Sequence, residues 1–206
     1  MKSFTTITFI AFATAAVAHP SLRSRQDGGC IVNTVDAPGF GDAMNSINAW
    51  TSDVNNVNSF LNTAAGLDSS TLGNAASFAL GNATDEPCQL ATLSNFGTAF
   101  GLLTDAFTCA VADLKVVFGD HVLTNLETII ADPTNGDAVH AAITDINFFR
   151  CCNVLVDADL LWLDSADRAG IADSVPINAG RPDACSSVDC SGVTSCRSKD
   201  NAQFGQ

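Results

Sequence analysis

Basic residues are scarce in this sequence of 206 residues. Nine Lys and Arg stand against 22 Asp and Glu, so the net charge is −13 at pH 7. The phosphate backbone of a nucleic acid, or an anionic membrane surface, would repel a chain with this balance. The composition therefore argues against nucleic acids and anionic membranes as partners.

Several motifs of enzymes and metal centres are also missing. The chain has two Glu, Glu86 and Glu127, and no Glu-x-x-His, so it lacks the ligands of a ferritin-like di-iron site. It contains neither His-Glu-x-x-His nor Gly-x-Ser-x-Gly, and no two cysteines have the Cys-x-x-Cys spacing of a zinc site. We therefore predict a protein that is not an enzyme and that has no cofactor or metal.

The remaining polar candidates have plain structural interpretations. His121 follows Asp120 where a helix is expected to start, and His140 is interpreted as a surface residue of a later helix. Asp157 and Asp159 stand two positions apart in an apolar helix, so their side chains point to different faces. This spacing argues against a pair of carboxylates that work together as acid and base.

Apolar runs long enough to cross a membrane comfortably are absent, which predicts no membrane span. The run Phe4–Val17 follows the basic residue Lys2 and ends in Ala16-Val17-Ala18, a pattern typical of a secretory signal peptide over residues 1–18. We therefore expect a secreted, extracellular protein in which residues 19–35 form an N-terminal arm.

The cysteines agree with secretion, because their number is even and all of them follow the predicted cleavage site. They are Cys30, Cys88, Cys109, Cys151, Cys152, Cys185, Cys190 and Cys196. In an oxidising compartment they predict four disulfides. Neighbouring residues on a helix point about 100° apart, so the Cys151–Cys152 doublet should take two separate partners. We expect these to be Cys88 and Cys109, with Cys30 pairing with the C-terminal group.

Apolar residues recur with helical spacing through most of the chain. In the first segment they occupy positions 40, 47, 54 and 61 and positions 43, 50, 57 and 64, an a/d repeat over four heptads. The other positions are mainly Asn, Ser and Thr rather than charged, so we expect packing within one bundle and a monomeric protein. Caps, prolines and further apolar repeats predict five helices, over residues 40–66, 70–80, 87–114, 121–130 and 138–163.

The predicted fold class is therefore all-α, a bundle of about five helices over residues 36–166. Gly119 and Asp120 are expected to end the third helix, and Gly97 and Gly101 either weaken it or allow another helix to approach closely. Gly, Ser, Asp and Pro are frequent from residue 167 onward, so residues 167–206 are predicted to form an irregular tail held by cysteines.

Arg150 is a candidate for a structural ion pair. It is the one Lys or Arg of the apolar helix 138–163 and stands beside the cysteine doublet. A buried guanidinium needs a carboxylate, and Asp145, Asp157 or an Asp of another helix is expected to supply it. The alternative, an anchor for a ligand, stays open.

Asn82 is a candidate glycosylation site. Asn82-Ala83-Thr84 is an N-glycosylation sequon, and it stands just before Pro87, where a loop is expected. Occupancy of this site is therefore plausible in a secreted glycoprotein.

Three segments carry a resemblance to known proteins. The signal peptide, the helix Ile47-Asn-Ala-Trp-Thr-Ser-Asp-Val54 and the segment Asp145-Ile-Asn-Phe-Phe-Arg-Cys-Cys-Asn153 resemble small secreted, cysteine-containing helical proteins of filamentous fungi. The heptad helix also resembles hydrophobic surface-binding protein A, a secreted helical fungal family. That resemblance covers residues 36–164 and implies the coating of apolar surfaces and the recruitment of hydrolases, with no catalytic residues.

Three functional hypotheses follow. The first is a secreted, non-enzymatic binding or surface-associated protein whose partner is an apolar surface, a cell-wall component or a host protein. The second is a secreted effector that acts on a host or a competitor. The third is a carrier of a small molecule or lipid in a cavity between helices. A continuous exposed apolar patch would favour surface coating, and an enclosed apolar cavity would favour a carrier.

Overall fold

The computed structural model describes residues 38–196. The predicted signal peptide (1–18), the arm (19–35), which includes Cys30, and the last part of the tail (197–206) lie outside the described residues. Within them all regular secondary structure is helical and no strand forms, so the all-α prediction is confirmed there. The α-helices are α1 (Phe40–Thr63), α2 (Ser69–Ala83), α3 (Glu86–Phe100), α4 (Asp105–Val117), α5 (Thr124–Ala131), α6 (Gly136–Phe149) and α7 (Leu155–Ala169).

Seven α-helices in the described residues replace the expected five, in part because the third predicted helix is two helices. Gly101 adopts the left-handed conformation, with φ of 73°, and ends α3. The hydroxyl of Thr104 then accepts a hydrogen bond of 3.1 Å from the Phe107 N–H and begins α4. The apolar repeat continues across this break, which is why periodicity alone predicts one helix.

Two π-helical segments join α-helices where the sequence predicts a break or a plain helix. Gly119 and Asp120 do not end a helix, because they lie in η2 (Phe118–Leu123), which links α4 to α5. A second π segment, η3 (Arg150–Val154), links α6 to α7 and holds the cysteine doublet. Wide turns of this kind are frequent at functional sites.

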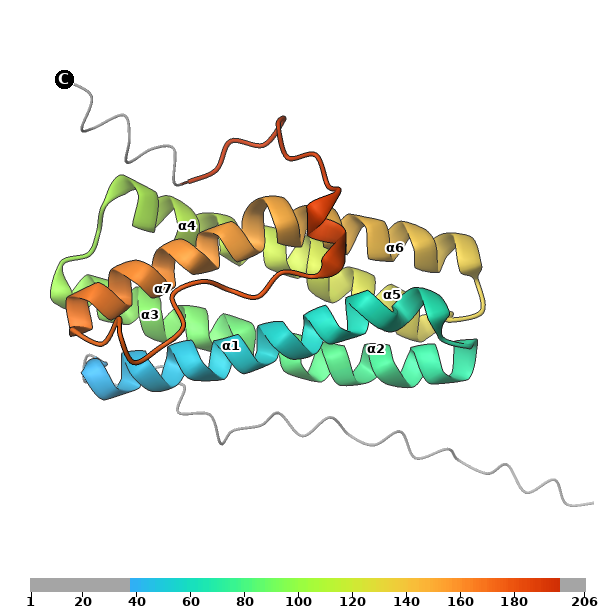
Figure 1. Cartoon of the computed structure of the whole chain (residues 1–206), viewed down its shortest axis with the longest axis horizontal. Helices are drawn as coiled ribbons and strands as arrows, with labels where there is room; N and C mark the ends of the chain where they lie inside the picture. Colours follow the sequence, from blue (N-terminus) through green and yellow to red (C-terminus); the bar gives the residue numbers. More distant parts are fainter. Residues whose placement is uncertain (1–37, 197–206) are drawn as a thin grey trace, which may run out of the picture.

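The apolar stripe of α1 lies in the core of the bundle. Its residues Ile47, Trp50, Val54 and Val57 are at most 1% exposed. The Trp50 ring meets Trp162 of α7 edge to face, with ring centroids 5.8 Å apart, a geometry worth about 1 kcal/mol beyond the area it buries. Around this contact α1 packs against α2 and α3, α4 packs against α7, and α5 packs against α2 and α6 (Figure 1).

The tail runs from the end of α7 back along the bundle and is tied to it by disulfides (Figure 1). The pairs are Cys109–Cys196, Cys151–Cys185 and Cys152–Cys190. In the chain-entropy model, closing a loop of 34 residues, as in Cys151–Cys185, stabilises the fold by about 4 kcal/mol. Disulfide bonds of this number fit an oxidising, extracellular environment.

These pairs confirm the disulfides and the stapled tail but correct the expected partners. The doublet takes two tail cysteines rather than Cys88 and Cys109, because the tail folds back over η3, which spacing along the chain does not reveal. Cys88 is also disulfide-bonded. All three cysteines of the tail are bonded to cysteines of the helical region, so the expected pairing of Cys30 with the tail is wrong.

From 38 to 196 no helix combines the length and the apolar character that a membrane crossing requires.

Gly97 allows α3 and α4 to approach closely, one of the two roles expected for it. A Cβ atom built on Gly97 would lie 2.5 Å from Cε1 and Cζ of Phe107, whose ring is buried. The Gly97→Ala variant should therefore lose about 1–3 kcal/mol of the free energy of unfolding, because the packed ring has to shift. Urea denaturation of the oxidised protein measures this loss.

Gly41 provides the matched control. It also lies in a helix, but a Cβ atom there would meet nothing within 4 Å. The Gly41→Ala variant should stay within about 0.5 kcal/mol of the wild type. Equal effects at the two positions would show that close helix packing is not the reason for Gly97.

Candidate functional site

An apolar cavity of about 300 Å³ lies between α3, α4 and η2, with Trp50 of α1 on its wall. We call it the α3–α4 cavity. Its lining residues are Trp50, Glu86, Pro87, Leu90, Ala91, Leu114, Lys115, Phe118, Gly119 and Leu123. The volume is at the lower end of the range of ligand pockets. Two of the lining residues, Glu86 and Lys115, have ionisable side chains.

Local sequence signals bring these residues to the cavity. Glu86 and Pro87 form the first turn of α3, where an acid and a proline are both favoured. Leu90 lies one turn further along the same helical face as Glu86. On the facing side, Leu114 of α4 and Phe118 of η2 are also one turn apart.

The side chain of Glu86 lines the cavity, and its carboxylate accepts hydrogen bonds from two buried donors. The Trp50 indole N–H donates a hydrogen bond of 2.8 Å to Oε2 of Glu86. Nη1 of Arg150 lies 3.3 Å from Oε1 of the same carboxylate. Arg150 is 0% exposed and Glu86 is 1% exposed, so this ion pair is completely buried.

The second terminal nitrogen of the Arg150 guanidinium is bound by α1. Its Nη2 donates to the carbonyl oxygen of Val54 at 3.4 Å and to Oδ1 of Asn58 at 3.1 Å. The Asn58 amide in turn donates a hydrogen bond of 2.8 Å to the carbonyl of Gly180 in the tail. One network therefore connects the cavity wall, α1, η3 and the tail.

The observed partner of Arg150 differs from the expected one. It is a glutamate of α3, and neither Asp145 nor Asp157. One sequence signal could have found Glu86. It precedes Leu90 and Leu93 by four and seven residues, so it belongs to the apolar face of α3, where a charge needs a buried partner. The pairing itself spans 64 positions, beyond the reach of local patterns.

Burial acts on both members of the ion pair. Loss of solvation raises the pKa of Glu86 above its ordinary value, while Arg150 and the Trp50 N–H act in the opposite direction. Burial likewise lowers the pKa of Arg150, and Glu86 counters this effect. A paired carboxylate and guanidinium present no net charge to the cavity.

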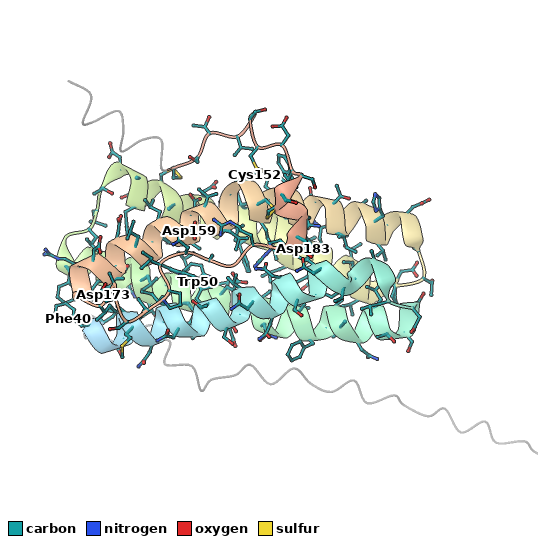
Figure 2. The ribbon with its side chains drawn as sticks, viewed as in Figure 1. Phe40, Trp50, Cys152, Asp159, Asp173 and Asp183 are labelled. Atoms are coloured by element: carbon teal, nitrogen blue, oxygen red, sulfur yellow. A yellow bond between two sulfur atoms is a disulfide. The ribbon has the colours of Figure 1, made fainter. Side chains whose placement is uncertain are left out.

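A second acidic site lies outside the cavity, between α4 and α7. Burial, together with the neighbouring carboxylate of Asp113, raises the pKa of Asp157 to about 8. With a pKa near 8, Asp157 keeps its proton at neutral pH, while Asp113 accepts a hydrogen bond of 3.0 Å from the Asn153 amide. Asp159 (Figure 2) instead faces the tail, where Arg181 Nη2 lies 2.6 Å from its Oδ2. Asp157 lies beside Asp113 of α4, so the two side chains do point to different faces.

The histidines lie apart from the cavity lining. His121 is inside η2 rather than at a helix start, because the π segment continues the chain through the expected cap. Its Nδ1 lies 2.8 Å from Oδ2 of Asp145, and its ring stacks on Phe149 with centroids 3.3 Å apart. His140 is exposed, as expected, and lines a second, more polar cavity of about 350 Å³ where α2 and α6 begin. In the described chain no three His, Cys, Asp or Glu gather into a possible metal site.

Asn82 lies in α2 rather than in the expected loop, because α2 continues to Ala83. The residue is 8% exposed. Its Nδ2, the atom to which a glycan is attached, donates a hydrogen bond of 2.8 Å to the Phe78 carbonyl. Its Oδ1 accepts one of 2.8 Å from Asn56 of α1. Glycosylation of Asn82 stays a prediction, and it requires attachment before this turn of α2 folds.

Comparison with known proteins adds no relative from which a role could be carried over. No protein-family model matches the chain, and neither a curated protein nor a solved structure matches it. The function is therefore inferred from the geometry of the site.

The buried ion pair gives a prediction for stability. Replacing Arg150 by Met keeps an unbranched stem but leaves Glu86 buried without a counter-charge, which should cost about 3–5 kcal/mol of the free energy of unfolding. Urea denaturation measures the loss. The double variant Arg150→Met with Glu86→Gln removes both charges and should recover part of it. No recovery would mean that packing, rather than charge, accounts for the loss.

The acid pair gives a prediction for pH dependence. The folded-state pKa of Asp157 is about 8, above its ordinary value of 3.8, so the folded chain binds this proton more tightly than the unfolded chain. Its contribution to stability is complete below about pH 4 and is lost as the pH rises toward 8. The Asp157→Asn variant should therefore gain stability relative to the wild type across this range, on the order of 3 kcal/mol by pH 8.

Thermal unfolding from pH 4 to pH 9 follows this difference. Asp167→Asn, at an exposed position of the same helix, is the control and should run parallel to the wild type at every pH. A constant difference between Asp157→Asn and the wild type would contradict a raised pKa.

Proposed function

We propose that the chain is a secreted, non-enzymatic binding protein that carries a small apolar molecule in the α3–α4 cavity. The signal-peptide pattern at the N-terminus and the disulfides of the tail support secretion. The carrier role rests on one observation, the apolar cavity that lies between helices next to a buried ion pair.

The lining of the cavity suits an apolar guest. Leu90, Ala91, Leu114, Phe118 and Leu123 supply aliphatic and aromatic surface, and transfer of apolar area from water to such a wall is favourable by about 25 cal/mol per Å². The disulfide-tied tail, together with the network around Arg150, holds the surrounding helices in place. A preformed site lowers the cost of ordering on binding.

The chemistry of the lining supports binding rather than catalysis. The ten residues that line the cavity include no His, Cys, Ser or Thr, so a nucleophile and a base are not brought together there. The acid pair of Asp113 and Asp157 and the His121–Asp145 pair are not among them. Neither pair therefore belongs to the wall of the α3–α4 cavity.

Association with an apolar surface is the second candidate. Phe40 is 49% exposed at the start of α1 and contacts Phe100, with ring centroids 5.0 Å apart (Figure 2). Leu103, 59% exposed, follows Phe100 by three residues. These side chains form a small apolar end of the bundle, which would suit adsorption rather than enclosure.

A native mass spectrum of the protein purified from its secretion medium tests the carrier role first. A stoichiometric adduct of low mass is the expected result. Binding of an environment-sensitive apolar dye to the protein freed of that adduct then measures the site directly. The Ala91→Trp variant should abolish dye binding, because the indole fills the cavity.

Ala99→Trp is the matched control, since Ala99 is an exposed residue of the same helix. This variant should bind the dye like the wild type. Equal binding by both variants, together with adsorption to polystyrene that Ala91→Trp leaves unchanged, would overturn the carrier proposal and favour surface association.

A further inference from the structure

The cation at the cavity carries information about the ligand. Among the described residues there is one lysine, Lys115. It is exposed on α4 and also lines the α3–α4 cavity. Within residues 38–196 it forms no ion pair. Lys115 is therefore a basic residue without an ion-pair partner that contacts both the apolar cavity and solvent.

The other basic side chains of the described region do not share this position. Arg150 is paired with Glu86 and Arg181 with Asp159. Arg168 is exposed in the last turn of α7, away from the cavity lining. Lys115 is thus the basic residue of the cavity that is left to meet a ligand.

The charge of the whole protein makes this placement selective. At a net charge of −13, the surface potential disfavours anions in general. An anionic group would be held where a local cation offsets that field. The inner wall adds no preference for a cation, because Trp50 and Arg150 already donate to the two oxygens of Glu86.

We propose that the ligand is an anionic amphiphile, a single alkyl chain that ends in a carboxylate. The chain lies in the α3–α4 cavity, and the carboxylate meets the Lys115 ammonium at the opening. This inference rests on the carrier role proposed above and adds the chemical class of the ligand. The cavity volume equals the share of roughly ten water molecules in the liquid, so a chain of medium length is the appropriate probe.

Three probes with the same alkyl chain and different head groups test the inference. Decanoate, decanol and decyltrimethylammonium are each titrated into the full secreted protein that holds the apolar dye, and the dye signal reports displacement. Wild-type protein should bind decanoate about fivefold more tightly than decanol, the equivalent of about 1 kcal/mol for a partly exposed ion pair. The preference should decrease as salt is added.

Substitutions at Lys115 identify the source of the preference. Lys115→Gln should lower the affinity for decanoate about fivefold and leave that for decanol unchanged, while Lys115→Arg should keep both. Lys115→Glu should favour decyltrimethylammonium over decanoate. Arg168→Gln removes an exposed positive charge outside the cavity and serves as the control, with affinities equal to those of the wild type.

The outcomes separate the two proposals. If decanol and decanoate bind equally, or if Lys115→Gln keeps the preference for decanoate, the anionic class is wrong while the carrier role stands. If wild-type protein prefers decyltrimethylammonium, the ligand class is cationic and the inference is overturned. If no probe displaces the dye, or none is affected by Ala91→Trp, the carrier role itself is wrong.

Discussion

The guanidinium of Arg150 is completely buried, and an unpaired cation in that position would cost more free energy than a domain of this size can spare. Glu86 supplies the opposite charge, and Val54 and Asn58 of α1 accept hydrogen bonds from Nη2. The placement of α1, α3 and η3 relative to one another therefore depends on this one guanidinium. Moving any one of them would leave a buried charge or donor unpaired.

The tail belongs to the same system. The carbonyl of Gly180 accepts a hydrogen bond from Asn58, and a Cβ atom at this position would lie 2.7 Å from Oδ1 of Asn55, so a larger residue would have to displace the Asn55 side chain. Nearby, Asp159 of α7 binds Arg181 at 2.6 Å, while the disulfide Cys151–Cys185 fixes the next turn of the tail. The covalent links hold the tail where its polar groups complete the network.

The network also explains the character of the α3–α4 cavity. Glu86 would make the wall anionic, but its charge is balanced from behind by Arg150, so the wall is effectively apolar. Charge reaches the opening through Lys115 alone among the lining residues. The Arg150–Glu86 pair thus leaves the inner wall of the cavity without net charge, and Lys115 is the basic residue of its lining. The proposed apolar ligand and its proposed anionic head group both depend on this arrangement.

The sequence by itself determined the features that act over a few residues. Apolar spacing, the Asp68 cap of α2 and the acid and proline of α3 all depend on neighbours within about one turn, so helices appear where these patterns predict them. The even number of cysteines in a chain expected to be secreted predicted disulfides, and with them a stapled tail, without any knowledge of which cysteines pair. The missed break at Gly101 shows the limit of periodicity, because one positive φ overrides a continuous apolar repeat.

Tertiary structure alone decided the partners. Glu86 meets Arg150 across 64 positions, and Cys109 meets Cys196 across 87, because helices and tail fold back on one another. The cavity likewise depends on tertiary structure, because its lining comes from α1, α3, α4 and η2. Local free energies select a helix, whereas the choice among several distant partners depends on which arrangement buries all charges in pairs.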